Sequence, residues 1–109
     1  MKTYFGLGDL IERLKLEDPA KVIKRGFDNP HSYRGDYSEL AFEPTGPISI
    51  GNMLLSAEES MGTEFTGYKG GEFIMNEGTN CWISEYGSGG GQLIGEWLID
   101  YMLADEVKP

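Results

Sequence analysis

Two short segments of the chain share one order of residue types: an aromatic ring, a cation, glycine, an acid and a second aromatic ring. They are Tyr33-Arg34-Gly35-Asp36-Tyr37 and Tyr68-Lys69-Gly70-Gly71-Glu72-Phe73. Arg34 and Lys69 are the only basic residues between positions 26 and 107, where fourteen acidic residues occur. A cation beside aromatic rings suits a small planar or anionic ligand, because the cation neutralises charge and the rings stack. The same order of residues is also compatible with two ordinary turns.

The first of these segments, with the residues just before it, is the richer in groups that can bind a ligand. Residues 29–37 provide a guanidinium, an imidazole, two phenols and a hydroxyl, from Arg34, His31, Tyr33, Tyr37 and Ser32. Such a set can hold phosphate oxygens while a planar base stacks on an aromatic ring. In the structural alternative, the tyrosines cover a sheet edge, Asp36 caps a turn and Arg34 pairs with a nearby carboxylate. The sequence leaves both interpretations open.

Catalysis by a cysteine, a serine or a metal ion has little support in the sequence. His31 is the only histidine and lies fifty residues before Cys81, which we predict to be a buried thiol in a strand. Ser88 lacks the glycine that a nucleophile elbow requires two positions earlier. One histidine and one cysteine provide no zinc cluster, and the acids in residues 28–43 lack the spacing of a calcium loop. We therefore predict no catalytic residue, no metal and no cofactor.

A glycine-rich run, residues 87–91, lies between a predicted strand and a predicted helix. Backbone N–H groups at such a junction can hold a phosphate, which makes the run a secondary candidate site. However, the run lacks the Lys-Ser/Thr ending of a P-loop, and Gln92 occupies the place of the third glycine in a dinucleotide-binding motif. A flexible connection between the two elements is the alternative.

Length and charge restrict the class of protein. A chain of 109 residues predicts one domain, residues 1–109, and no apolar run approaches the roughly 20 residues of a membrane helix. The first residues show no apolar signal region, and a single cysteine fits a reducing compartment, so we expect a cytoplasmic protein without a membrane partner. The net charge of −9, with six of the nine basic residues in positions 1–25, disfavours binding of duplex nucleic acid.

The hydrophobic pattern predicts an α+β fold. Two short N-terminal helices are indicated, one with Asp9 at or near its N-cap and one over residues 19–25, between Asp18-Pro19 and Gly26. Two main helices are predicted over residues 49–61 and 92–103. In the second, an apolar stripe that includes Trp97 and Tyr101 is expected to pack across the sheet.

The strands are expected to form a small antiparallel sheet of three or four strands, packed by the two main helices. Residues 27–36 are predicted to be a loop that leads into a strand over residues 37–43. Further strands are indicated at residues 64–66, 72–75 and 80–86, with the last two joined as a hairpin. In the last strand, alternation places Trp82 on one face of the sheet and Cys81 on the other.

Three blocks of sequence, in order, resemble blocks found in small proteins of tailed bacteriophages. They are His-Ser-Tyr-Arg-Gly-Asp-Tyr-Ser-Glu-Leu-Ala-Phe-Glu-Pro at 31–44, Tyr-Lys-Gly-Gly at 68–71 and Cys-Trp-Ile-Ser-Glu-Tyr-Gly at 81–87. The resemblance spans residues 26–87 and implies a phage accessory protein. By analogy, a short acidic phage protein without a nucleophile or a metal cluster is similar to inhibitors of bacterial immunity. Several such families enclose a cyclic nucleotide or cyclic ADP-ribose signal.

The leading hypothesis is an anti-defence protein that sequesters a small nucleotide-like immune signal without catalysis. The predicted ligand-binding residues are His31, Ser32, Tyr33, Arg34, Tyr37, Lys69 and Trp82. A small domain encloses little ligand alone, so we expect a homo-oligomer with sites at its interfaces. Two alternatives remain open: an acidic protein that inhibits a host defence protein by binding it, and a small phosphohydrolase or lyase that uses His31 and a carboxylate.

Overall fold

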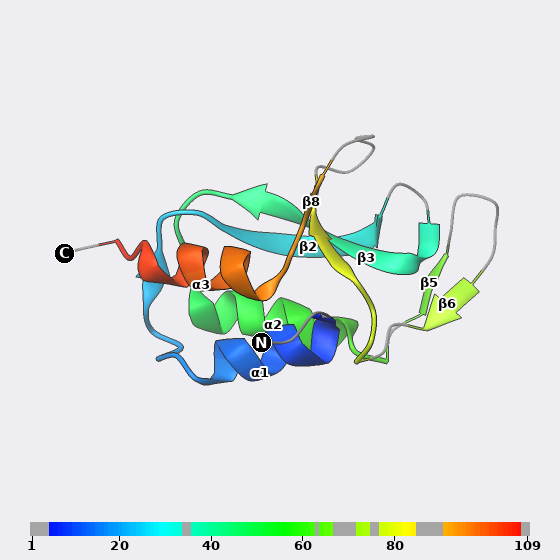
Figure 1. Ribbon diagram of the computed structural model, residues 1–109, viewed down its shortest axis with the longest axis horizontal. Coiled ribbons are helices and arrows are strands. Elements are labelled where there is room, and N and C mark those ends of the chain that lie inside the picture. The colour runs from blue at the N-terminus through cyan, green and yellow to red at the C-terminus, as the bar shows by residue number, and fades with distance from the viewer. Residues whose placement is uncertain are drawn as a thin grey trace.

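The computed structural model is an α+β protein, as the hydrophobic pattern predicts (Figure 1). It describes the backbone of residues 5–33, 36–62, 64–66, 72–74, 77–84 and 91–107, and the side chains of residues 5–31, 39–62, 77–84 and 91–107. In chain order the elements are α1 (Leu7–Lys15), β1 (Val22–Ile23), β2 (Gly26–Tyr33), β3 (Asp36–Thr45), β4 (Ile48–Ser49), α2 (Ile50–Ser60), β5 (Glu64–Thr66), β6 (Glu72–Ile74), β7 (Cys81–Ile83), β8 (Gln92–Leu93) and α3 (Glu96–Ala104).

Helix α1 begins where a distant turn satisfies its first backbone donors. The N–H groups of Leu7 and Gly8 donate to the carbonyl oxygens of Thr79 and Glu77, at 2.8 and 2.9 Å. The carboxylate of Asp9 accepts from the N–H of Gly6 at 3.0 Å, so Asp9 is the third residue of the helix rather than its N-cap. These bonds supply partners for N–H groups that an isolated helix leaves unpaired, and they fix the turn at residues 77–79 against α1.

The prediction of a second N-terminal helix over residues 19–25 is wrong. Residues 19 and 20 form a turn, and Val22 and Ile23 form β1, which pairs with Ser49 and Ile48 of β4. The carbonyl oxygen of Lys21 accepts from the N–H of Ile50, the first residue of α2, at 2.8 Å. Long-range pairing therefore satisfies backbone groups of this segment that a short helix would have paired locally.

The main sheet has the strand order β2-β3-β7-β8 and is mixed. β2 pairs with β3, and β7 with β8, in antiparallel fashion, whereas β3 and β7 are parallel. The segment predicted to be a loop before residue 37 is largely strand β2, so the first half of the sheet is a hairpin. The predicted hairpin between the strands at 72–75 and 80–86 is also wrong, because β6 pairs with β5 and β7 joins the main sheet.

A bulge near the middle of β2 sets the orientation of the residues that follow it. Asp28 pairs with Glu43 and His31 with Ala41, so three steps along β2 match two along β3. Asn29 has a φ of 53°, a left-handed conformation that asparagine tolerates better than most residues. Its side-chain N–H donates to Glu43 at 3.1 Å. Pro30 is compatible with this position because β2 is an edge strand and the ladder is already interrupted there.

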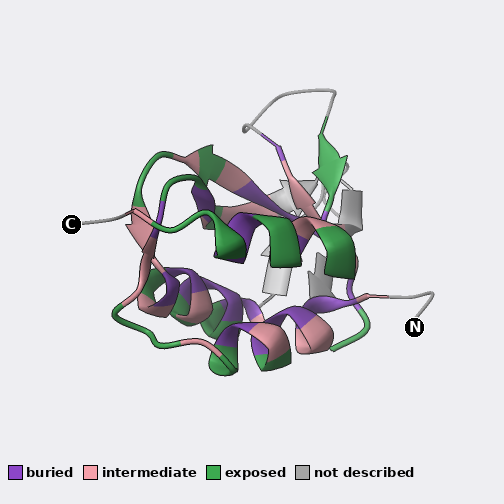
Figure 2. Ribbon diagram, turned by 60° about the vertical axis from the view of Figure 1, so that its left-hand side comes forward, coloured by how far each residue is buried: buried purple, intermediate pink, exposed green. Residues whose placement is uncertain are grey.

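The three helices lie on one side of the main sheet and bury its inner face (Figures 1 and 2). From β3 and β7 the core receives Leu40, Phe42 and Cys81, each at most 1% exposed. The rings of Phe27 and Phe42 lie 4.6 Å apart between centroids. The helices contribute Leu7, Leu10, Ile11, Leu14, Ile50, Met53, Ala57, Ile99, Met102 and Leu103 to the same cluster. In the part of the chain that the structure describes, no helix is long and apolar enough to cross a membrane.

The two main helices occur close to their predicted positions. Ser49 is the N-cap of α2, where its hydroxyl oxygen accepts from the N–H of Asn52 at 3.2 Å. α3 begins at Glu96 rather than at Gln92, because Gln92 and Leu93 pair with β7. The expectation that Trp97 and Tyr101 pack across the sheet is wrong, since they are 74% and 65% exposed.

Arg13 connects the first and last helices through charged hydrogen bonds. Its Nε donates to Asp100 of α3 at 2.7 Å, and its Nη1 donates to Glu17 at 2.8 Å. These bonds raise the pKa of Arg13, and the bond from Arg13, followed by that from Lys21, lowers the pKa of Glu17. The ionised forms of both groups are therefore favoured in the folded protein.

Candidate functional site

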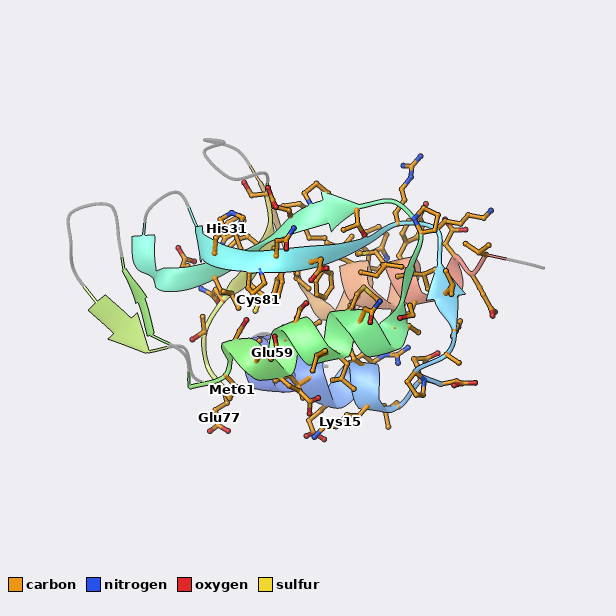
Figure 3. All side chains as sticks on the ribbon, turned by 180° about the vertical axis from the view of Figure 1, so that it is seen from behind. Lys15, His31, Glu59, Met61, Glu77 and Cys81 are labelled. Carbon is orange, nitrogen blue, oxygen red and sulfur yellow. The ribbon has the colours of Figure 1, made fainter. Side chains whose placement is uncertain are left out.

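Two of the predicted ligand-binding residues lie in one row on the outer face of the main sheet. His31 of β2 and Trp82 of β7 both pair with Ala41, which lies between them on β3. Paired residues on neighbouring strands project to the same face, and Leu40 and Phe42 beside Ala41 face the helices. Ala41 is fully buried and yet lies outside the core cluster. His31, Ala41 and Trp82 therefore belong to the face directed away from the helices, as Figure 3 shows for His31.

The indole of Trp82 is held in place by a residue that the sequence did not single out. Its Nε1–H donates to Glu39 Oε1 at 3.0 Å, and the side-chain N–H of Asn80 donates to the same oxygen at 3.2 Å. Glu39 is two residues before Ala41 and so projects from the same face. Because the polar edge of the indole is used by Glu39, the group that Trp82 can offer a ligand is the face of its ring. The residue types alone did not predict this contact, since it depends on the parallel pairing of β3 with β7.

The imidazole of His31 is oriented by its own strand. His31 Nδ1 lies 3.1 Å from the carbonyl oxygen of Asn29. A carbonyl oxygen only accepts hydrogen bonds, so Nδ1 carries the proton in this contact. In the neutral ring Nε2 is then a hydrogen-bond acceptor. The carbonyl group of Asn29, in the bulge, thus provides one partner for this side chain.

The two cationic segments are each flanked by a pair of antiparallel strands, and these pairs are in contact. Tyr33 pairs with Asp36 at the end of the β2–β3 hairpin, and Arg34 and Gly35 lie between these two residues in the sequence. Lys69 belongs to the connection between β5 and β6, which also pair in antiparallel fashion. β2 contacts β5, and β3 contacts β6. Figure 1 shows the β5–β6 pair beside the end of the β2–β3 hairpin.

The remaining predicted site residues are only partly described by the structure. The backbones of Ser32 and Tyr33 lie in β2 and that of Tyr37 in β3, but their side chains are outside the described set. Arg34, Lys69 and residues 87–90 of the glycine run lie outside the described residues, and of the run only Gly91 is described. The structure therefore places His31 and Trp82 on one face of the main sheet, on either side of Ala41, and the backbones of Ser32, Tyr33 and Tyr37 on strands β2 and β3.

A surface groove of about 650 Å³ lies on the opposite side of the molecule from the outer sheet face. It is formed by α1, the end of α2 and the turn at residues 77 and 78. Neither His31 nor Trp82, the two predicted site residues whose side chains the structure describes, lines it. Among the described residues that line it are four acids and one cation, Lys15, which pairs with Glu58 at 3.8 Å. Figure 3 labels Lys15, Met61 and Glu77 of this groove. Such a groove repels an anion, so it does not suit an anionic ligand.

Within the described residues, no group of three or more histidine, cysteine or acidic side chains is arranged to hold a metal ion. Cys81 packs in the core, where its Sγ lies 3.6 Å from the carbonyl oxygen of Thr79. Burial raises the pKa of the Cys81 thiol to about 12. A thiol that remains protonated near neutral pH is a poor nucleophile.

Cys81 is expected to react very slowly with thiol reagents while the protein is folded. A rise in pKa from 9.0 to about 12 lowers the thiolate population on the order of 1000-fold at pH 8, and burial restricts access further. The rate of labelling by 5,5′-dithiobis(2-nitrobenzoate) measures this, with the protein in urea as the control. Labelling of the native protein at the rate of a free cysteine would contradict the burial of Cys81.

No protein-family model, no curated protein and no solved structure matches this chain. The functional interpretation therefore depends on the chemistry and arrangement of the residues above. Two features bear on it most directly: the row of His31 and Trp82 on the outer sheet face, and the contact between the two strand pairs that flank Arg34 and Lys69.

Proposed function

We propose that the protein binds and sequesters a small nucleotide-like anion without converting it. The observation that carries the proposal is the contact of hairpin β2–β3 with strands β5 and β6, because these strands flank the two cations of residues 26–107. A nucleotide presents phosphate charge and a planar base, and both types of partner occur in these segments. Arg34 and Lys69 neutralise the phosphate, while Tyr33, Tyr37 and Trp82 offer rings for the base.

The charges on the outer sheet face favour separate binding regions for the phosphate and for the base of the ligand. Glu39 and Glu43 lie on β3, so a phosphate directly over the middle of this strand would meet negative charge. The phosphate is therefore assigned to the end of the β2–β3 hairpin, beside the cationic segments. The base is assigned to the ring of Trp82, and His31 contributes a hydrogen bond between the two regions. Ser32 pairs with Leu40, whose side chain faces the helices, so Ser32 is not assigned to the outer face.

The biological ligand that we propose is a nucleotide signal of bacterial immunity. This part of the proposal is supported by the resemblance of residues 26–87 to small tailed-bacteriophage proteins, for which a host-cell role against defence systems is the natural context. Homo-oligomers with sites at their interfaces belong to the same proposal, because two shallow faces enclose a nucleotide better than one. Sedimentation of the protein with and without ligand measures the oligomeric state.

Isothermal titration against a panel of cyclic nucleotides and cyclic ADP-ribose tests the binding function. At least one member is expected to bind and to be recovered chemically unchanged. Arg34→Ala and Lys69→Ala are each expected to weaken binding by roughly 10- to 100-fold, because each removes a charge-assisted contact to phosphate of about 1.5–3 kcal/mol.

Arg25→Ala is the matched control, because it removes one positive charge from an exposed residue before the site strands begin. It is expected to leave the affinity nearly unchanged. Recovery of an altered ligand would instead support the phosphohydrolase or lyase. Absence of heat with every member of the panel, or equal effects of Arg25→Ala and Arg34→Ala, would show that the proposed site is wrong.

A further inference from the structure

The outward side of α3 carries two large aromatic rings that the fold does not bury. Trp97 and Tyr101, one helical turn apart, are 74% and 65% exposed. Their rings stack, with centroids 5.6 Å apart and an interplanar angle of 16°. Figure 2 shows much of α3 as exposed. Tryptophan and tyrosine are the residues most enriched among those that dominate protein–protein binding energies, so an exposed stacked pair indicates an interaction surface.

Acidic residues form a second row beside the aromatic pair. Glu96 and Asp100 are also one turn apart, and both are exposed. Asp105 and Glu106 follow the helix, and both are exposed as well. Two cations reach this surface, Arg13 bound to Asp100 and Lys24 paired with Asp105 at 3.6 Å. The described surface thus has four acids and two cations, and it keeps a negative charge after its ion pairs are made.

We propose that this face of α3, defined by Glu96, Trp97, Asp100 and Tyr101, docks an arginine-bearing basic segment of another protein. A guanidinium can lie flat on the ring of Trp97 while it donates to the carboxylate of Glu96 or Asp100 in the adjacent row. The two rows are parallel along the helix because residues four apart lie on the same side. This docking surface is independent of the proposed anion site, since it uses other residues and another element.

Charge complementarity selects a basic partner over a second copy of this chain. In a two-fold contact through α3, the acids of one copy would approach those of the other, and like charges at an interface oppose association. A basic segment is instead attracted by the acids of this face. The aromatic pair adds a defined binding position, which electrostatic attraction alone does not provide.

Fluorescence anisotropy with a labelled peptide of alternating arginine and serine tests the docking surface. The peptide is expected to bind the wild-type protein and to be displaced by salt. Trp97→Ala and Tyr101→Ala are each expected to weaken binding about fivefold, the change that corresponds to loss of a cation–π contact at an exposed site. A peptide with citrulline in place of arginine, which lacks the charge, should not bind measurably.

Leu16→Ala is the matched control, because Leu16 is 78% exposed on another part of the molecule and the substitution also leaves the charge unchanged. It is expected to bind like the wild type. Urea unfolding of all three variants checks that each remains folded, as the exposure of these side chains implies. Failure of the wild type to bind the arginine peptide, equal binding by Trp97→Ala and Leu16→Ala, or Trp97-dependent dimerisation in sedimentation would each overturn the proposal.

Discussion

Replacement of Phe42 by alanine is expected to lower the free energy of unfolding by about 3–5 kcal/mol. Phe42 is fully buried on the central strand β3, packs against Phe27 and pairs with Ile83 of β7. Removal of the ring loses its burial and leaves a cavity between the sheet and the helices, which relax only in part. Since small domains have total stabilities of about 5–15 kcal/mol, the loss is a large fraction of the whole. Urea unfolding followed by circular dichroism measures it.

Leu55→Ala is the control for Phe42→Ala. Leu55 is 55% exposed on α2, and alanine is the better helix former, so the free energy of unfolding should change by less than about 0.5 kcal/mol. A change of less than about 1 kcal/mol for Phe42→Ala would contradict the packing of β3 against the helices. Such a small change would also contradict the assignment of Ala41 to the outer face, because that assignment depends on the inward direction of the neighbouring Phe42.

Replacement of Gly6 by alanine is expected to lower the free energy of unfolding by about 1–3 kcal/mol. A Cβ atom at this position would lie 2.5 Å from the carbonyl oxygen of Glu77 and 3.0 Å from the carbonyl carbon of Gly78. Both atoms are backbone, so no side chain can rotate away and the turn itself must move. The φ of Gly6 is −107°, which alanine can adopt, so the cost comes from this close approach. Thermal unfolding measures the change.

Gly46→Ala is the control for Gly6→Ala, because a Cβ atom there would meet nothing within 4 Å. It should leave stability unchanged or raise it by roughly 0.4–1 kcal/mol, through lower entropy of the unfolded chain. Hydrogen exchange of the Leu7 and Gly8 amides gives a second measurement, since both donate to the turn at residues 77–79. Faster exchange of these two amides is expected in Gly6→Ala alone. Equal stability of the two glycine variants would exclude the tight contact.

The elements that the sequence predicted best are those with local signals. α2 has a serine N-cap, an apolar stripe and a glycine after its end, and each signal acts within one helical turn. The segment 19–25 had similar local signals, yet pairing with β4 and α2 determined its conformation. For α3 the apolar pattern predicted a helix, but not which apolar residues would be covered. Leu98, Ile99, Met102 and Leu103 supply enough apolar surface for the core, and Trp97 and Tyr101 remain outside.

The candidate site could be predicted only in part from sequence for a related reason. The residue types of the β2–β3 segment indicated binding chemistry, but the neighbours of each residue depend on strand register. The bulge at Asn29 and the parallel pairing of Ala41 with Trp82 decide that His31 and Trp82 share a face. The role of Glu39 could not be predicted, because it is one of fourteen acids in residues 26–107 and its hydrogen bond to the indole of Trp82 depends on the fold.

The parallel pairing of β3 with β7 has a consequence for synthesis of the chain. A ribosome delivers β3 well before β7, because α2 and the β5–β6 pair lie between them in sequence. During that interval the nascent hairpin presents the unpaired backbone groups of residues 40–42 to other chains, and an open strand edge is a place where aggregation begins. Slow translation between residues 45 and 81 should therefore favour inclusion bodies, and expression at low temperature, where aggregation is slower, should favour recovery of the native protein.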